Sequence, residues 1–326
     1  PYQWPEGLRA DLADRLANIA LNRYPDPQAN GVRRPLRVFM NIPDELEMLF
    51  GNGSDEIIAL LIANSIKSGR GVCAPDPSFV MFQVLANQYS VPFKPLPLDA
   101  SFDIDLAGWM AGLVEADPAL IFIPQPNNPT GNLFSKDRLT EIVESTQALV
   151  VIDEAYTAFT DANYLDWAVT YPNVVVMRTL SKVGLAGSRF GMLIGHPDWI
   201  SEFEKTRLPY NINVLSQTAV QHALEHASIL DEQSQSIRKE RTRLTLGLSE
   251  RGFEVWLSEA NFVLIRCRAD QARPLFDALK THRILVKCLD KAHPRLKDTL
   301  RVTVGAPQET DALFAALDHL AAEFGR

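Results

Sequence analysis

Val174-Val175-Val176-Met177-Arg178-Thr179-Leu180-Ser181-Lys182 is the stretch of this sequence that most constrains its fold. The β-branched and apolar residues at its start predict a short strand over residues 174–178. Two hydroxyl side chains and a lysine come soon after this strand. Because ligands of open α/β sheets bind beyond the carboxyl ends of strands, this pattern predicts that Lys182 lies at the functional edge of such a sheet.

Two other predicted strands also end in polar residues. The strand predicted at residues 120–123 precedes the sequence Pro-Asn-Asn-Pro-Thr-Gly at 126–131, and the strand predicted at residues 149–153 begins the sequence Leu-Val-Val-Ile-Asp-Glu-Ala-Tyr at 149–156. Between them, residues 135–147 have a helical pattern. Alternation of strand, helix and strand favours a mostly parallel sheet covered by helices on both faces. The three polar segments are therefore expected to converge on one site.

A glycine-rich turn precedes the first buried helix. Residues 51–56 read Gly-Asn-Gly-Ser-Asp-Glu and lead into an apolar run. Ser54 is a suitable N-cap, and the two acidic residues after it suit the positive end of the helix dipole. Gly69 is the predicted end of this helix.

The pattern changes near the middle of the chain. Residues 214–250 predict one long polar helix. Shorter elements follow, with strands predicted at 253–256, 262–266 and 300–304 and helices at 274–280 and 309–324. We predict an α/β protein in which residues 1–22 form an N-terminal arm that packs with a small domain, residues 23–250 form the large ligand-binding domain, and residues 251–326 form the small domain.

Composition excludes several classes of protein. The net charge of −8 argues against nucleic acid or an anionic membrane as the main partner, because both attract basic surfaces. The apolar runs are too short to span a bilayer, and we expect no signal peptide at the start of the chain. Three scattered cysteines indicate a reduced, cytoplasmic protein. Because the sequence begins at Pro1 without methionine, a preceding segment is expected.

The six histidines do not predict a metal site. His222 and His226 are four residues apart in the predicted long helix, but the HExxH pattern of zinc proteases does not frame them. We expect them to face solvent or another helix, and we predict no bound metal.

Each polar segment has an ordinary interpretation when it is considered alone. Asn-Asn-Pro-Thr-Gly is typical of a turn, Asp153 could cap the next helix, and a serine–lysine pair is usually solvent-exposed. Their order and spacing are more informative. An amide loop, then Asp153 and Tyr156, then Lys182, and Arg189 seven residues later predict a shared site.

This combination resembles the class I/II aminotransferases of fold type I, which use pyridoxal phosphate, and among them the histidinol-phosphate aminotransferases. The resemblance covers nearly the whole chain, including Pro1-Tyr2, which is similar to the end of that family's N-terminal arm. Five segments carry it: Asn-Arg-Tyr-Pro-Asp-Pro at 22–27, Gly-Asn-Gly-Ser-Asp-Glu at 51–56, Arg-Thr-Leu-Ser-Lys at 178–182, Asn-Phe-Val-Leu at 261–264 and Leu-Arg-Val-Thr-Val-Gly at 300–305.

The resemblance implies a catalytic role for four residues. Lys182 would bind the cofactor covalently and carry the proton at the substrate α-carbon. Asp153 would keep the pyridine nitrogen protonated, because an opposite charge favours the charged form. Asn128 and Tyr156 would hydrogen-bond the 3′ oxygen of the ring.

The resemblance also implies a binding site for the cofactor phosphate. The backbone amides of Ser54, Asp55 and Glu56 lie at a predicted helix start, which suits an anion. Thr179, Ser181 and Arg189 would complete this site, although the family commonly places the arginine eight residues after the lysine rather than seven.

Two aromatic residues are implied to contact the cofactor. Phe79 would stack on the pyridine ring, at a position where the family often has tyrosine. Tyr24 would reach the cofactor phosphate of the partner subunit, so the resemblance implies a homodimer with shared sites.

Four residues are implied to contact the substrate. Arg301 would bind a substrate carboxylate or phosphate, and Tyr2 and Asn261 would line the pocket. Lys287 lies where the family usually has a second arginine. Lysine keeps the charge but loses the planar two-pronged contact.

The function that the resemblance implies is transamination of L-histidinol phosphate with 2-oxoglutarate, which yields imidazole-acetol phosphate and glutamate in histidine biosynthesis. Two other enzymes share the cofactor residues: an aromatic or broad-specificity aminotransferase and a threonine-phosphate decarboxylase. A non-catalytic binding module of the same fold is the alternative from another class.

Overall fold

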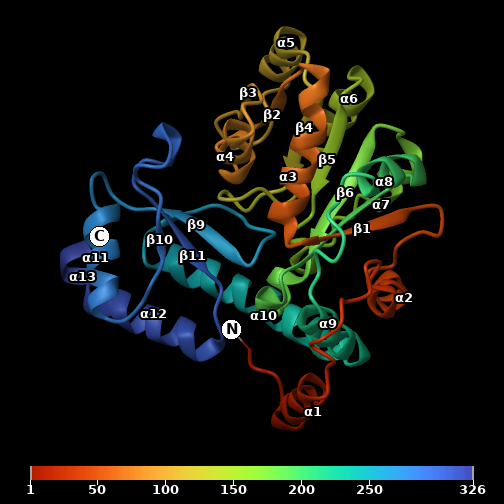
Figure 1. Ribbon diagram of the computed structural model, residues 1–326. Helices are drawn as coiled ribbons and strands as arrows, with labels where there is room; N and C mark the ends of the chain where they lie inside the picture. The colour runs from red at the N-terminus through yellow and green to blue at the C-terminus, as the bar shows by residue number, and fades with distance from the viewer. Residues whose placement is uncertain (1, 325–326) are drawn as a thin grey trace.

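The protein is described by a computed structural model that covers residues 2–324, except for the side chains of residues 322 and 323 (Figure 1). Its larger sheet has seven strands in the order β1-β7-β6-β5-β4-β2-β3. The strands are β1 (Glu47–Asn52), β2 (Val72–Asp76), β3 (Phe93–Pro97), β4 (Leu120–Pro124), β5 (Leu149–Asp153), β6 (Val174–Thr179) and β7 (Phe190–Gly195). Strands β2 to β6 are parallel, whereas β7 is antiparallel to both of its neighbours. The predicted, mostly parallel sheet is confirmed.

Helices cover both faces of this sheet (Figure 1). On β5, Val150 and Ile152 pack in one apolar cluster, and Leu149 and Val151 pack in another. The first cluster includes residues of α2 (Asn30–Phe39), α5 (Leu106–Ala116), α6 (Lys136–Ser145) and α7 (Leu165–Thr170), and the second includes residues of α3 (Ser54–Ser65), α4 (Met81–Gln88) and α8 (Pro197–Glu204). Burial on both faces explains why these strands are continuous apolar runs rather than alternating ones.

A second, antiparallel sheet lies apart from the first (Figure 1). Its strands are β8 (Glu254–Val255), β9 (Phe262–Arg266), β10 (Lys287–Cys288) and β11 (Thr299–Thr303), in the order β10-β11-β9-β8. Helices α10 (Ala227–Glu250), α11 (Ala272–Thr281), α12 (Pro307–His319) and α13 (Ala321–Phe324) complete this part. Ile237, Leu244 and Leu248 of α10 belong to its apolar cluster.

The N-terminal segment contacts both parts of the chain. Helix α1 (Glu6–Ala17) lies against α9 (Val214–Glu225), whereas Tyr2 packs with the apolar cluster of the smaller sheet. None of the residues of α1 is fully buried. The predicted domain division at residues 22 and 250 stays a prediction, and Pro1 lies outside the described residues.

Three predictions about helices were wrong in detail. The long helix expected over 214–250 is two helices, because the backbone leaves the helical conformation at His226. Gly53, not Ser54, is the N-cap of α3, and its φ of 82° is a conformation that glycine adopts without a steric penalty. Gly69 ends a short 3-10 turn, Ile66–Ser68, that follows α3.

No helix among residues 2–324 is both long enough and apolar enough to cross a membrane.

Candidate active site

A cavity of about 540 Å³ opens beyond the carboxyl ends of β2, β4, β5 and β6. Its wall includes side chains from both sheets. Eight residues that the sequence predicted for the site line it: Ser54, Phe79, Asn128, Asp153, Tyr156, Lys182, Lys287 and Arg301. The expected convergence of polar segments far apart in the chain is therefore present in the structure.

Asp153 is a buried carboxylate in the cavity wall. It is the last residue of β5, and the Ala155 amide donates a hydrogen bond of 3.0 Å to its Oδ1. Burial raises the pKa of Asp153 to about 7, although this hydrogen bond and the positive charge of Lys182 act in the opposite direction. Asp153 thus lacks a sufficient positive partner among the described residues, and a cationic group in the cavity would supply one.

Lys182 lies in the turn that follows β6. Its Nζ is 5.5 Å from the centroid of the Tyr156 ring. Burial lowers the pKa of Lys182, which makes its neutral, nucleophilic form more accessible. Burial also raises the pKa of Tyr156 to about 12, so Tyr156 remains a neutral phenol that can donate a hydrogen bond.

Arg301 approaches the cavity from the smaller sheet. Its Nη1 donates a hydrogen bond to Oδ1 of Asn128, and its guanidinium carbon lies 4.8 Å from the centroid of the Phe262 ring. Its buried Nε has no hydrogen-bond partner among the described residues. Lys287 of β10 pairs directly opposite Arg301 of β11, which places both cations on one face of the smaller sheet. This wall of the cavity suits an anionic group.

A second group of residues surrounds the start of α3. Arg189 lies against Gly53, where a Cβ atom would be only 2.4 Å from its Nη2, and its Nη2 is 3.4 Å from Oδ2 of Asp55. Thr179 is hydrogen-bonded to Ser181 through their side chains at 2.9 Å. An arginine beside free amides at a helix N-terminus forms a good binding site for a phosphate.

Comparison with known proteins agrees with this geometry. The family model for aminotransferase class I and II matches residues 4–319. This chain belongs to that family.

Relatives of this aminotransferase share much of its sequence. It is 43% identical to histidinol-phosphate aminotransferase 2 of Nitrosococcus oceani over 97% of this chain and 88% of that protein. It is 44% identical to histidinol-phosphate aminotransferase 1 of Burkholderia lata, over 97% of this chain and 89% of that protein.

Solved structures confirm the fold of this aminotransferase. The histidinol-phosphate aminotransferase of Clostridium acetobutylicum superimposes with a TM-score of 0.88 at 22% identity, covering 99% of this chain and 97% of that one. The Sinorhizobium meliloti enzyme, solved in complex with pyridoxal-5'-phosphate, has a TM-score of 0.87 at 23% identity, covering 98% of this chain and 87% of that one.

Several predicted residues of this aminotransferase do not line the cavity. Five of the residues predicted to bind the cofactor phosphate are not in its wall: Asp55, Glu56, Thr179, Ser181 and Arg189. The Glu56 side chain is directed toward Asn52 and Asn211, because its Oε2 accepts hydrogen bonds from the Asn52 amide and from the Asn211 side chain.

Three other residues that were predicted to bind the cofactor or substrate are also not in the cavity wall. Tyr24 is 82% exposed and stacks on Tyr210, with 4.6 Å between the ring centroids. Tyr2 packs in the apolar cluster of the smaller sheet, and the carbonyl of Asn261 accepts a hydrogen bond from the Val304 amide. Their predicted roles in binding stay predictions.

Two features of the aminotransferase site were missed from the sequence. The wholly buried Asn127 donates hydrogen bonds to the side chain of Thr130 and the carbonyl of Pro77, and accepts one from Ser78. It thereby fixes the loop that carries Asn128. His293 and Asp76 both lie in the cavity wall, with 3.3 Å between Nε2 of His293 and Oδ2 of Asp76. No local signal could have found this pair, because Asp76 ends β2 of the larger sheet and His293 lies between β10 and β11, far away in the chain.

A buried ion pair joins the ends of β5 and β6. The Arg178 Nε donates a hydrogen bond of 2.6 Å to Oε2 of Glu154, and both side chains are at most 5% exposed. Arg178 also donates to the side chain of Asn163 and the carbonyl of Met40, while Glu154 accepts from the Tyr164 amide. Because these residues adjoin Asp153 and the turn with Lys182, the pair holds two catalytic candidates in position.

Replacing Arg178 with leucine should lower the free energy of unfolding by about 3–5 kcal/mol, because it leaves the Glu154 carboxylate buried without a partner. Urea denaturation measures this change. The matched control is Arg238→Leu, which breaks an exposed 2.8 Å pair with Asp161 and should cost no more than about 1 kcal/mol. Equal effects of the two substitutions would contradict the importance of the buried pair.

Proposed function

We propose that this chain transaminates L-histidinol phosphate with 2-oxoglutarate in histidine biosynthesis, with pyridoxal phosphate as its cofactor. The observation that carries the proposal is one cavity that combines Lys182 and Asp153 with the cationic pair Arg301 and Lys287. The names of the relatives that share more than two fifths of the sequence support the same substrate.

The residues present fit pyridoxal phosphate. The start of α3 with Arg189 suits its phosphate, and the buried Asp153 suits its protonated ring nitrogen. Lys182 supplies the amine that the cofactor aldehyde requires. When bound, the cofactor provides an electron sink for the negative charge that develops at the substrate α-carbon.

The side chains of the chain would each do part of the chemistry. Asp153 would hold the proton on the ring nitrogen, because burial makes an unpaired carboxylate unfavourable and an opposite charge relieves this cost. Tyr156 and Asn128 would orient the ring by hydrogen bonds. Lys182, whose pKa burial lowers, would move the proton at the substrate α-carbon as a general base and acid.

Arg301 and Lys287 would hold the substrate anion. The unpartnered Nε of Arg301 is a donor available to a phosphate or carboxylate oxygen. The two substrates carry different anions, a phosphate in histidinol phosphate and a second carboxylate in 2-oxoglutarate. Two cations on one face of a sheet can accept either in turn.

Replacing Lys287 with arginine should lower KM for histidinol phosphate several-fold and leave kcat little changed, because the planar guanidinium binds phosphate through two hydrogen bonds. Arg301→Lys should have the opposite effect, raising KM by roughly tenfold. Steady-state kinetics with histidinol phosphate measure both. An unchanged KM in both variants would place the phosphate elsewhere.

A panel of donors tests the proposed function. Histidinol phosphate, phenylalanine and tyrosine are each supplied with 2-oxoglutarate, and glutamate formation is measured. A kcat/KM at least tenfold higher for histidinol phosphate supports the proposal. Equal or faster turnover of phenylalanine or tyrosine would instead indicate an aromatic aminotransferase. Release of CO2 from phosphothreonine would indicate a decarboxylase, and no turnover with cofactor bound would indicate a binding module.

The proposal extends to assembly and location. We propose a homodimer in which Tyr24, exposed in this chain, reaches the cofactor phosphate of the partner subunit. Sedimentation of the purified enzyme tests the dimer. The substitution Tyr24→Phe should weaken cofactor binding without dissociating the dimer. Three free cysteines are consistent with a cytoplasmic location.

A further inference from the structure

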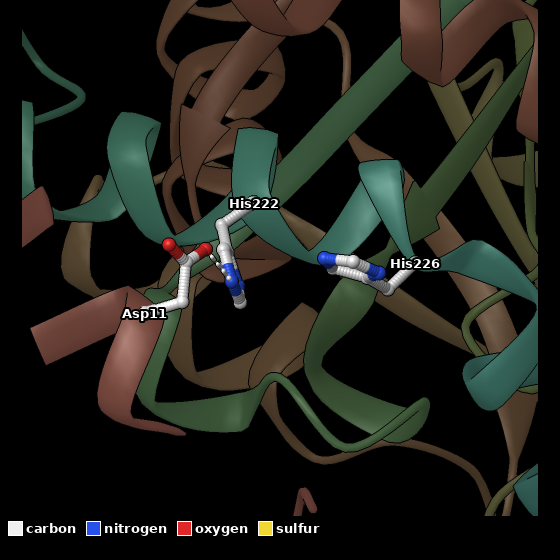
Figure 2. Close-up of side chains that lie close together, drawn as sticks. All are labelled: Asp11, His222 and His226. Carbon is white, nitrogen blue, oxygen red and sulfur yellow. Dashed lines mark ion pairs between the residues drawn. The ribbon is translucent and has the colours of Figure 1, made fainter. Parts of the chain in front are cut away.

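Two histidines and an aspartate meet between α1 and α9, outside the wall of the active-site cavity (Figure 2). His222 comes from α9, His226 follows its last turn, and Asp11 comes from α1. Each residue offers one potential ligand atom, and these three atoms all lie within 4.8 Å of one another. The rings of both histidines and the Asp11 carboxylate are directed toward a common region (Figure 2).

His222 is the most informative member of this cluster. Its side chain is wholly buried, yet neither ring nitrogen makes a hydrogen bond with the described residues. Its Nε2 lies 2.8 Å from Oδ2 of Asp11, but the oxygen is not in a direction from which the ring could hydrogen-bond to it. A buried polar atom without a partner is costly, so a further ligand that binds the ring nitrogen would relieve this cost.

The local charge favours a cation. Arg15 contacts Asp11 at 3.0 Å, but it is also bound to Glu225 at 2.8 Å. Two carboxylates and one guanidinium leave one net negative charge beside the two imidazoles. The positive charge of Arg15 is therefore compensated, and it does not exclude a metal ion.

We propose that Asp11, His222 and His226 bind a divalent transition-metal ion, with Zn²⁺ as the best chemical fit. Two imidazole nitrogens and one carboxylate oxygen are a common zinc ligand set, with water in the fourth position. Bonds of about 2.0–2.2 Å to a tetrahedral ion place its ligand atoms roughly 3.4 Å apart, so the cluster needs only small side-chain rotations. Asp11 is exposed and His226 is half-buried, so neither side chain is confined by complete burial.

The ion would attach the N-terminal arm to the rest of the enzyme. Helix α1 buries none of its residues fully, and Arg15 of α1 pairs with Glu225 of α9 at 2.8 Å. A metal ion that bridges the two helices would add ligand bonds to a helix, α1, that has no fully buried residue. Its role is to fix the arm, and it takes no part in the transamination chemistry.

Zinc binding to the enzyme loaded with pyridoxal phosphate tests the proposal. Equilibrium dialysis against Zn²⁺ followed by metal analysis should give one tightly bound ion per chain. Asp11→Asn and His226→Gln should each weaken this binding at least about tenfold, since loss of even an outer partner of a ligand commonly has that effect. Both substitutions alter exposed or half-buried side chains, so the fold should persist.

Two control variants distinguish Zn²⁺ binding at this site from Zn²⁺ binding at other histidines and carboxylates. Asp14→Asn removes an exposed carboxylate of the same helix, and His319→Gln disrupts a second pair of histidine rings, whose centroids are 5.4 Å apart. Neither should change the affinity for Zn²⁺. If Asp11→Asn and His226→Gln bind Zn²⁺ as the unmodified enzyme does, the ion is adventitious only, and the proposal is overturned.

Trp4 provides a readout that does not depend on stoichiometry. Its ring lies 5.6 Å from that of His222, so a paramagnetic ion such as Co²⁺ at this site should quench its fluorescence. The quenching should disappear in Trp4→Phe and in Asp11→Asn. Quenching that persists in both variants would place the ion near another tryptophan and contradict the site.

Discussion

Replacing Lys182 with alanine is expected to lower kcat for transamination by at least about 10⁴-fold. Lys182 is proposed both to bind the cofactor and to move the proton at the substrate α-carbon, whereas Lys287, also in the cavity wall, is assigned to the substrate anion. Removal of Lys182 therefore eliminates two functions together. Glutamate formation from histidinol phosphate measures the loss, and the visible absorbance of the bound cofactor should change as well.

A matched control distinguishes this effect from a general loss of positive charge. Lys297 is an exposed lysine whose Nζ lies 3.3 Å from Asp270, away from the cavity wall. Lys297→Ala should retain full activity. A small amine added to Lys182→Ala should restore part of the rate, because it can replace the missing base. Turnover by Lys182→Ala at more than about one hundredth of the normal rate would refute the assignment of Lys182.

Replacing Asp153 with asparagine is expected to lower kcat by about 10²–10³-fold, because an amide cannot balance the positive charge of a protonated ring nitrogen in a buried site. Asp153→Glu should be less damaging, since it keeps the charge. Cofactor affinity, measured by equilibrium dialysis, should fall in Asp153→Asn. Normal kcat in that variant would mean that Asp153 does not face the cofactor.

Asp153 also predicts how the stability of the cofactor-free protein depends on pH. Its pKa rises from an ordinary 3.8 to about 7 on folding, so the folded state binds more protons than the unfolded state between these values. The contribution of this carboxyl to the free energy of unfolding is therefore fully present below about pH 4 and is lost as the pH rises toward 7. The loss is of the order of a few kcal/mol.

Urea denaturation of the cofactor-free protein at pH 5 and pH 8 checks this expectation. The unmodified chain should lose more stability between these two pH values than Asp153→Asn, in which position 153 no longer titrates. Identical pH dependence in both proteins would mean that burial does not raise the pKa of this carboxyl.

The central strands could be predicted because the sequence carries their signal locally. The bounds of β5, residues 149–153, match the prediction at both ends. An apolar run buried on both faces and followed by a polar residue needs no distant partner to be recognised. The edge strands β1 and β3 were missed, and so was β7, which lies between β1 and β6. Strand β3 reads Phe-Lys-Pro-Leu-Pro, and two prolines usually argue against a strand unless it lies at an edge.

Some features of the candidate site could likewise be predicted from the sequence, and others could not. The sequence by itself determined which residue types end the central strands, and therefore that Asp153, Asn128 and Lys182 would meet in one cavity. Only the tertiary structure decided that Arg301 contacts Asn128 and that Asp11 lies beside His222. These pairs join segments that are far apart in the chain. Local propensity fixes where a strand ends, but contacts between distant elements depend on how whole elements pack, which no local pattern encodes.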